Sequence, residues 1–190
     1  MNAQLTLETL IAEIQSADDN VRAAARDHAG PLGAAAVGPL AKIACEGDLE
    51  IARAANRAMQ NVVYHAGRPG AADEAKAVAA ELIKLVGPQP PLQFRRDVLW
   101  MLWQIAGPEA VAPVAALLSN PDLREDARMC LEGLPAAEAV DALRTALAAA
   151  PDDFKPAVAH SLRKRGVEVP GVPELRLVPT KQTSVKPVGR

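Results

Sequence analysis

The chain has 190 residues, of which 49% are hydrophobic and only 3% aromatic, so alanine, leucine and valine must fill the core, and this composition favours helices over strands. Its net charge of −2 is uneven, because residues 175–190 carry four bases and no acid, whereas the rest carries 17 bases and 23 acids. This acidic body argues against a nucleic-acid-binding protein, and no apolar run approaches the roughly 20 residues that span a membrane.

A short phrase recurs five times along the chain. It consists of a large apolar residue, usually followed by a base, with a small or β-branched residue four positions on and a core-type residue eight positions on. Its copies begin at Val21, Ile51, Phe94, Leu123 and Phe154. This i, i+4, i+8 spacing lies on one face of a helix. The copies are 30, 43, 29 and 31 residues apart, which is the period of a helical repeat array.

The pattern predicts an N-terminal capping helix near residues 5–16, followed by pairs of helices. The first helix of each pair is expected near residues 19–29, 48–65, 91–106, 121–133 and 152–165. The second helix is expected near residues 33–45, 71–86, 108–118 and 136–149. Aspartate or asparagine precedes most first helices, where the side chain can cap free backbone N–H groups.

The predicted fold class is therefore all-α, a right-handed α–α superhelix of about 4.5 to 5 helical-hairpin repeats and about ten helices. We expect this solenoid to occupy residues 1–166. From residue 167 to 190 the helical period stops and prolines interrupt a polar, basic sequence, which predicts an extended C-terminal tail.

The segment 19–25 (Asp-Asn-Val-Arg-Ala-Ala-Ala), then Leu32-Gly33 and the segment 36–40 (Ala-Val-Gly-Pro-Leu), resembles a short bacterial type of HEAT repeat that also occurs in phycobilisome-lyase-like proteins. The resemblance covers residues 5–165, although later copies are more degenerate. It implies a protein-interaction scaffold or adaptor, with the second helices lining a concave side. The exposed residues that it places there are Lys42, Lys76, Lys84, Glu138, Asp141 and Arg144. The alternative that it implies is a lyase-like or chaperone-like factor that handles a tetrapyrrole (bilin).

Both tryptophans of the chain lie in residues 94–103. Trp100 and Trp103 are three positions apart and so share a helix face, next to Arg95 and Arg96. Because tryptophan and arginine dominate interface energetics, these four residues and Tyr64 are the candidate partner-binding residues. The competing interpretation is that the tryptophans fill space between the second and third repeats. A resemblance to HEAT-like DNA alkylation-repeat glycosylases is superficial, because those proteins need a basic groove.

Two sets of basic residues have a structural and a binding interpretation. The bases at the second position of the phrase (Arg22, Arg95, Arg124 and Lys155) are expected to pair with acids of neighbouring repeats, as in HEAT arrays, or to form a ligand-binding stripe. The acids expected to pair with them are Asp19, Asp48, Asp122 and Asp152. Residues 163–165 (Arg-Lys-Arg) suit the negative end of the last helix and are alternatively a site for an anionic partner.

The tail contains a candidate linear motif, formed by Val178, Pro179, Thr180, Lys181 and Thr183. Three interpretations of this segment are that a partner protein binds it, that it folds back on the acidic body, and that it is an unconstrained solvated tail.

No catalytic constellation is visible. The three histidines lie in different repeats without ligand-type spacing, there is no phosphate-binding glycine loop, and Cys45 and Cys130 lack a partner cysteine. We therefore expect no enzyme activity, no metal and no cofactor. The N-terminus lacks the features of a secretory signal, so we expect a cytoplasmic protein without nucleic-acid or membrane partners, either a monomer or a weak oligomer.

Overall fold

The computed structural model describes residues 6–174, and within this range the chain is all-α, with ten α-helices, three short 3₁₀ helices and no strand. This confirms the predicted fold class at the level of all-α, and each predicted helix has a counterpart. The α-helices are α1 (Leu7–Ile14), α2 (Asp19–His28), α3 (Ala34–Glu46), α4 (Leu49–Ala66), α5 (Ala72–Ile83), α6 (Leu92–Ile105), α7 (Val111–Ala115), α8 (Arg124–Gly133), α9 (Ala137–Ala149) and α10 (Lys155–Lys164). The 3₁₀ helices are η1 (Gly30–Leu32), η2 (Pro108–Ala110) and η3 (Ala116–Ser119).

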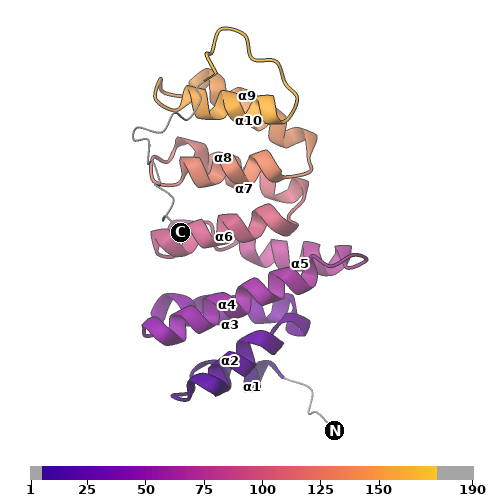
Figure 1. The fold of residues 1–190 in the computed structure, drawn as a ribbon, viewed down its shortest axis with the longest axis vertical. Coiled ribbons are helices and arrows are strands. Elements are labelled where there is room, and N and C mark those ends of the chain that lie inside the picture. Colours follow the sequence, from indigo (N-terminus) through magenta and orange to yellow (C-terminus); the bar gives the residue numbers. More distant parts are fainter. Residues whose placement is uncertain (1–5, 175–190) are drawn as a thin grey trace, which may run out of the picture.

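The helices form two layers that run along the long axis of the molecule (Figure 1). In the first layer, α2, α4, α6, α8 and α10 follow one another, and each contacts the next. In the second layer, α1 contacts α3, α3 contacts α5, and α7 contacts α9, while η2 contacts both α5 and α7. The handedness of this stack and its HEAT-type identity stay predictions.

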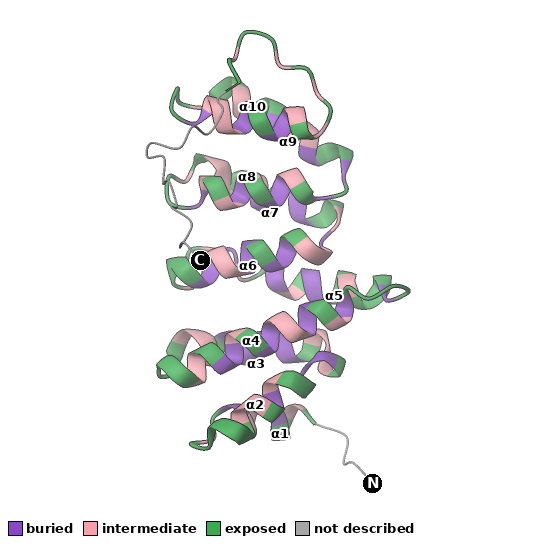
Figure 2. Cartoon of the chain, in the orientation of Figure 1, coloured by how far each residue is buried: buried purple, intermediate pink, exposed green. Residues whose placement is uncertain are grey.

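The repeated phrase supplies a core that continues from one repeat to the next (Figure 2). All ten residues at its fifth and ninth positions are buried: Ala25, Ala29, Ala55, Met59, Val98, Leu102, Ala127, Leu131, Val158 and Leu162. The starting residues of the last three copies are buried too, whereas Val21 is 36% exposed. Six of the ten are leucine, valine or methionine, and burying one such side chain contributes about 1.5 to 3 kcal/mol, so this row is a main source of stability.

Three first-layer helices begin near the aspartates and asparagines that the sequence marks. The Asp18 carboxylate accepts a hydrogen bond from Asn20 N (2.8 Å), and that of Asp48 accepts one from Ile51 N (3.1 Å). The side chain of Asn120 accepts from Asp122 N (2.9 Å), but this bond closes a turn, and α8 begins only at Arg124. Such caps typically contribute about 1 kcal/mol each.

The helix predicted over residues 108–118 is not continuous. It is divided into η2, the five-residue α7 and η3. Pro108 starts η2 and Pro113 is the third residue of α7, whereas α3 runs unbroken across its own Pro39, so a proline alone does not explain the division. The second layer is therefore less regular between α5 and α9 than the repeat predicts.

The chain does not leave the body at the predicted boundary after residue 166. Helix α10 ends at Lys164, and Gly166 reverses the chain with a left-handed φ of 78°. Val167 and Val169 then pack against the core. Arg163 Nη2 donates to the Val169 carbonyl (3.0 Å) and also bonds the Val172 carbonyl. Residues 167–172 thus form part of the C-terminal end of the stack.

Candidate interaction surface

Exposed apolar side chains from three consecutive first-layer helices meet on one surface, which we call the aromatic stripe. Its members are Tyr64 on α4, Trp100 and Trp103 on α6, and Met129 on α8, with exposed fractions of 53%, 44%, 47% and 56%. The rings of Tyr64 and Trp100 pack edge to face, with centroids 6.4 Å apart. Trp100, Trp103 and Met129 line one hollow. The sequence prediction that places Tyr64 beside the two tryptophans is consistent with this arrangement.

Helical periodicity puts these side chains outside. On α6, Leu99, Met101 and Leu102 are buried, so the residues that flank them, Trp100 and Trp103, face outward. The exposed halves of both tryptophans are available to a partner, while Trp100 also packs against Tyr64 between the second and third repeats. Large exposed apolar patches on a folded domain commonly mark interaction sites.

The hollow beside the stripe has a volume of about 120 Å³ and a polar edge. Arg96 and Asp126 form this edge, where Arg96 Nε lies 3.5 Å from Asp126 Oδ2 and Arg96 Nη2 donates to the Asp122 carbonyl (2.9 Å). Arg96 Nε is buried and makes no hydrogen bond within the described residues. The hollow is the size of one side chain and combines apolar walls with a charged edge.

Trp103 owes its position to a glycine on the neighbouring helix. A Cβ atom on Gly133 would lie 1.8 Å from Nε1 and 2.0 Å from Cδ1 of Trp103, far inside van der Waals contact. The φ of Gly133 is not positive, so its backbone does not require glycine. The indole lies against the end of α8 only because no side chain occupies position 133.

Arg95 is not part of this surface, so its predicted role in partner binding gains no support from the structure and stays a prediction. Only 9% of it is exposed, and its Nε and Nη2 both donate to the Val86 carbonyl (3.1 and 3.0 Å). This satisfies a backbone acceptor just after α5 and ties α6 to it. Asp97 is also engaged, since its carboxylate accepts hydrogen bonds from Asn56 (2.7 Å) and Gln93 (3.1 Å).

The expected ladder of ion pairs between repeats is mostly absent among the four bases, all of which lie in the described range. Arg124 does reach the next repeat, but its partner is Asp153 (2.5 Å). The other three stay local because their nearest acceptors belong to their own helix or to a preceding turn: Arg22 pairs with Asp19, Lys155 with Asp152, and Arg95 with a carbonyl.

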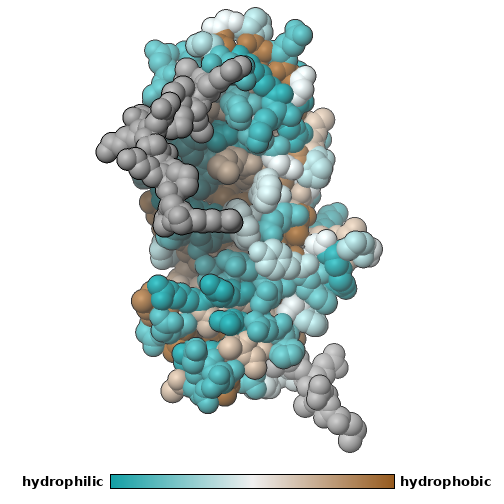
Figure 3. Space-filling view, in the orientation of Figure 1, coloured by the Kyte–Doolittle hydropathy of each residue, from teal (hydrophilic) through white to brown (hydrophobic). Residues whose placement is uncertain are grey.

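The residues predicted to line a concave side are all exposed and belong to the second layer. Lys42 is on α3 and Lys76 on α5, Lys84 follows α5, and Glu138, Asp141 and Arg144 are on α9. They do not join the aromatic stripe, which is on the first layer. Lys84 pairs with Glu81 (2.7 Å) and Arg144 with Asp141 (3.1 Å). In the view of Figure 3, hydrophobic side chains form separate patches among hydrophilic ones.

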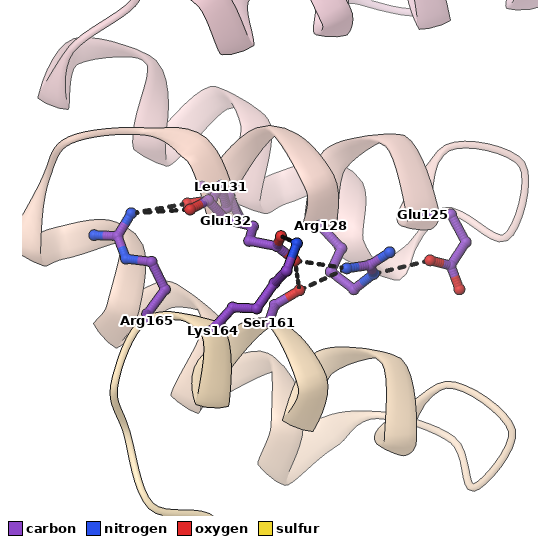
Figure 4. A network of polar contacts seen from close by, with 7 residues as sticks. All are labelled: Glu125, Arg128, Leu131, Glu132, Ser161, Lys164 and Arg165. Carbon is purple, nitrogen blue, oxygen red and sulfur yellow. Dashed lines mark hydrogen bonds and ion pairs between the residues drawn. The ribbon is translucent and has the colours of Figure 1, made fainter. Parts of the chain in front are cut away.

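A polar network joins α8 to α10 (Figure 4). Glu132 Oε2 accepts from Ser161 Oγ (2.7 Å) and Arg128 Nη1 (3.1 Å), and Glu132 Oε1 accepts from Lys164 Nζ (2.8 Å). Arg128 Nη1 also donates to Ser161 Oγ (2.6 Å), and Arg165 bonds carbonyls at the end of α8. Burial acts to raise the pKa of Glu132, but hydrogen bonds from Lys164 and Ser161 and the charge of Arg128 hold it below its usual range.

This network is structural in character. Ser161 is fully buried, and the donors and acceptors satisfy one another across the two helices. It also accounts for two of the three bases at residues 163–165, and the third, Arg163, bonds the chain that follows α10. The three bases thus have partners within the chain, which the sequence does not reveal because Glu132 lies 32 positions before Lys164.

The buried thiol and the potential metal ligands are two further kinds of reactive group in the described range. Cys130 is 1% exposed, and burial raises the pKa of its thiol to about 12. No three histidine, cysteine, aspartate or glutamate side chains within residues 6–174 lie close enough together to hold a metal ion. None of the helices in that part of the chain has both the length and the hydropathy of a membrane span.

Comparison with known proteins adds little to this picture. No protein-family model matches the sequence, and no curated protein matches it. One crystal structure, of an engineered protein, is similar over 83% of this chain and 78% of that one, with 20% identity and a TM-score of 0.45.

The candidate tail residues Val178, Pro179, Thr180, Lys181 and Thr183 lie outside the described residues.

Proposed function

We propose that this protein is a non-catalytic interaction scaffold or adaptor that binds a partner protein through the aromatic stripe. The observation that supports this proposal is the grouping of Tyr64, Trp100, Trp103 and Met129 on three consecutive helices, each about half exposed. Aromatic side chains of this kind supply most of the energy in many protein interfaces. On the HEAT resemblance, we further propose that it acts in the bacterial cytoplasm as a monomer or weak oligomer.

The hollow between α6 and α8 suggests what the partner presents. Its volume of about 120 Å³ suits one apolar side chain, with Arg96 and Asp126 available to bond polar groups around it. Interfaces typically combine such a desolvated centre with a polar edge that excludes water. We infer that the partner inserts an apolar anchor beside Trp100 and Met129.

The tetrapyrrole alternative finds less support at this surface. It requires an apolar groove near Tyr64, Trp100 and Trp103. The hollow there is well below the roughly 300 to 1,000 Å³ of small-molecule sites, so it does not enclose a bilin.

The proposal is tested by capturing partners from an extract of the source cells with the full chain and three variants. Trp100→Ala and Tyr64→Ala remove stripe side chains. Leu49→Ala is the matched control, because Leu49 is an exposed apolar residue (64%) at the other end of α4. A captured protein is then purified and titrated against each variant, whose folding is checked by circular dichroism.

We expect Trp100→Ala to weaken binding by about 2 kcal/mol or more, which is about 30-fold in Kd, and Leu49→Ala to leave it nearly unchanged. A partner that binds the stripe variants as tightly as the wild type contradicts the proposal.

A further inference from the structure

The aromatic stripe lies close to the place where the chain continues into its basic C-terminal segment. Lys164 at the end of α10 bonds Glu132 near the end of α8, and Arg165 bonds the Glu132 carbonyl (3.2 Å). The indole of Trp103 packs against Gly133, the next residue of α8. The chain after α10 therefore starts from residues 164 and 165, which are bonded to α8 at the end of the stripe where Trp103 lies.

Arg163 holds the chain at this end for several more residues. It bonds the carbonyls of Val169 and Val172, so residue 172 is still anchored to α10. Residues 175–190 begin three positions later. Sixteen residues reach up to about 50 Å when extended at ~3.1 Å each. Neighbouring helices lie about 8 to 10 Å apart, so about 30 Å separates α10 from α4, and the segment is long enough to cover the stripe as far as Tyr64.

The sequence of this segment has a chemistry that suits the stripe. It starts with the apolar run Leu175-Arg176-Leu177-Val178, followed by Pro179, and it carries four bases and no acid. Aromatic grooves bind proline-containing extended segments, and indole and phenol faces attract arginine and lysine. The rest of the chain has six more acids than bases, so the charges of the two parts are complementary.

We propose that residues 175–190 dock on the aromatic stripe of the same chain, with the apolar run 175–178 covering Trp103 and Met129. Docking shields the surface and makes the segment a competitor of the partner. The competition rests on the proposed function, but the docking itself does not. A tethered segment acts at an effective concentration on the order of millimolar, so even weak docking keeps the stripe covered.

Tryptophan fluorescence tests this directly, because both tryptophans of the chain are in the stripe. Acrylamide quenching is compared for the full-length wild type, Val178→Asp and Gln182→Asp. The last variant is the control, because it adds the same charge outside the apolar run. We expect Val178→Asp to raise the quenching constant clearly and shift the emission to the red, and Gln182→Asp to change both much less. A synthetic peptide of residues 175–190, added at millimolar concentration, should reverse the effect of Val178→Asp.

Equal quenching in all three proteins overturns the docking proposal, as does a peptide that leaves the Val178→Asp variant unchanged. These outcomes are separate from partner binding, which is measured by the dependence on Trp100. If the docking proposal is right and a stripe partner exists, Val178→Asp should also bind that partner several-fold more tightly. Docking without any Trp100-dependent partner would leave the inference standing and remove the proposed function.

Discussion

The packing of Trp103 on Gly133 makes a prediction about a single methyl group. Replacing Gly133 with alanine puts a Cβ atom 1.8 Å from the indole Nε1, so Trp103 must leave its position. A fully exposed tryptophan has about 250 Å² of surface. With 47% of it exposed in the structure, about 130 Å² is buried, which at about 25 cal/mol per Å² corresponds to at most ~3 kcal/mol. We expect the displaced indole to lose about half of this, so Gly133→Ala should destabilise the protein by about 1 to 2 kcal/mol.

The assay is urea unfolding followed by far-ultraviolet circular dichroism, in a double-mutant cycle with Trp103→Ala. Without the indole, Gly133→Ala should be neutral or stabilising by up to about 1 kcal/mol, because alanine favours the helix more than glycine does. Tryptophan emission of the single Gly133→Ala variant should shift to the red. If Gly133→Ala has the same effect on stability with and without Trp103, the indole does not pack on Gly133.

Three further results follow from buried polar and thiol groups. Because the pKa of Glu132 is lowered in the folded state, the stabilisation that its carboxylate provides is present above the ordinary carboxyl pKa of about 4.3 and is lost as the pH falls through the lower folded-state value. Glu132→Gln should therefore reduce the acid sensitivity of urea unfolding below about pH 4.5. Identical pH profiles of the variant and the wild type would contradict this. Arg95→Ala should lower the free energy of unfolding in urea by about 1 to 3 kcal/mol, because the Val86 carbonyl loses its donors. The variant should still bind the partner as the wild type does. A variant of full stability that no longer binds would instead place Arg95 in the interface. In thiol titration at pH 8, the partly exposed Cys45 should react slowly in the native protein, and Cys130 should react only after unfolding. If both thiols react fast in the native protein, Cys130 is not buried.

The helices were predictable because their determinants are local. The fifth and ninth positions of the phrase repeat at helical spacing, and all of them are buried. The cap at Asp48 likewise needs only residues within three positions. The prediction was less accurate over residues 108–118, where the repeat pattern is present but the second helix is divided into η2, α7 and η3.

The candidate surface was only partly predictable. Spacing alone put Trp100 and Trp103 on one helix face, but it did not show that Met129 and Gly133 complete their surroundings from α8. Arg95 and Arg96 are adjacent in sequence and looked equivalent. In the structure Arg95 is buried on the Val86 carbonyl, while Arg96 lines the hollow, because adjacent residues on a helix point about 100° apart.

The sequence by itself therefore determined the all-α class, the number and order of the helices and the residues of their buried faces, because these depend on spacings within one helix. Only the tertiary structure decided which outward-facing residues meet. The ties between Glu132 and Ser161, between Arg124 and Asp153, and between Trp103 and Gly133 each join neighbouring repeats through residues 29 or 30 positions apart. Such contacts depend on how far one repeat is shifted and rotated against the next, and a repeat with variable spacing does not encode that locally.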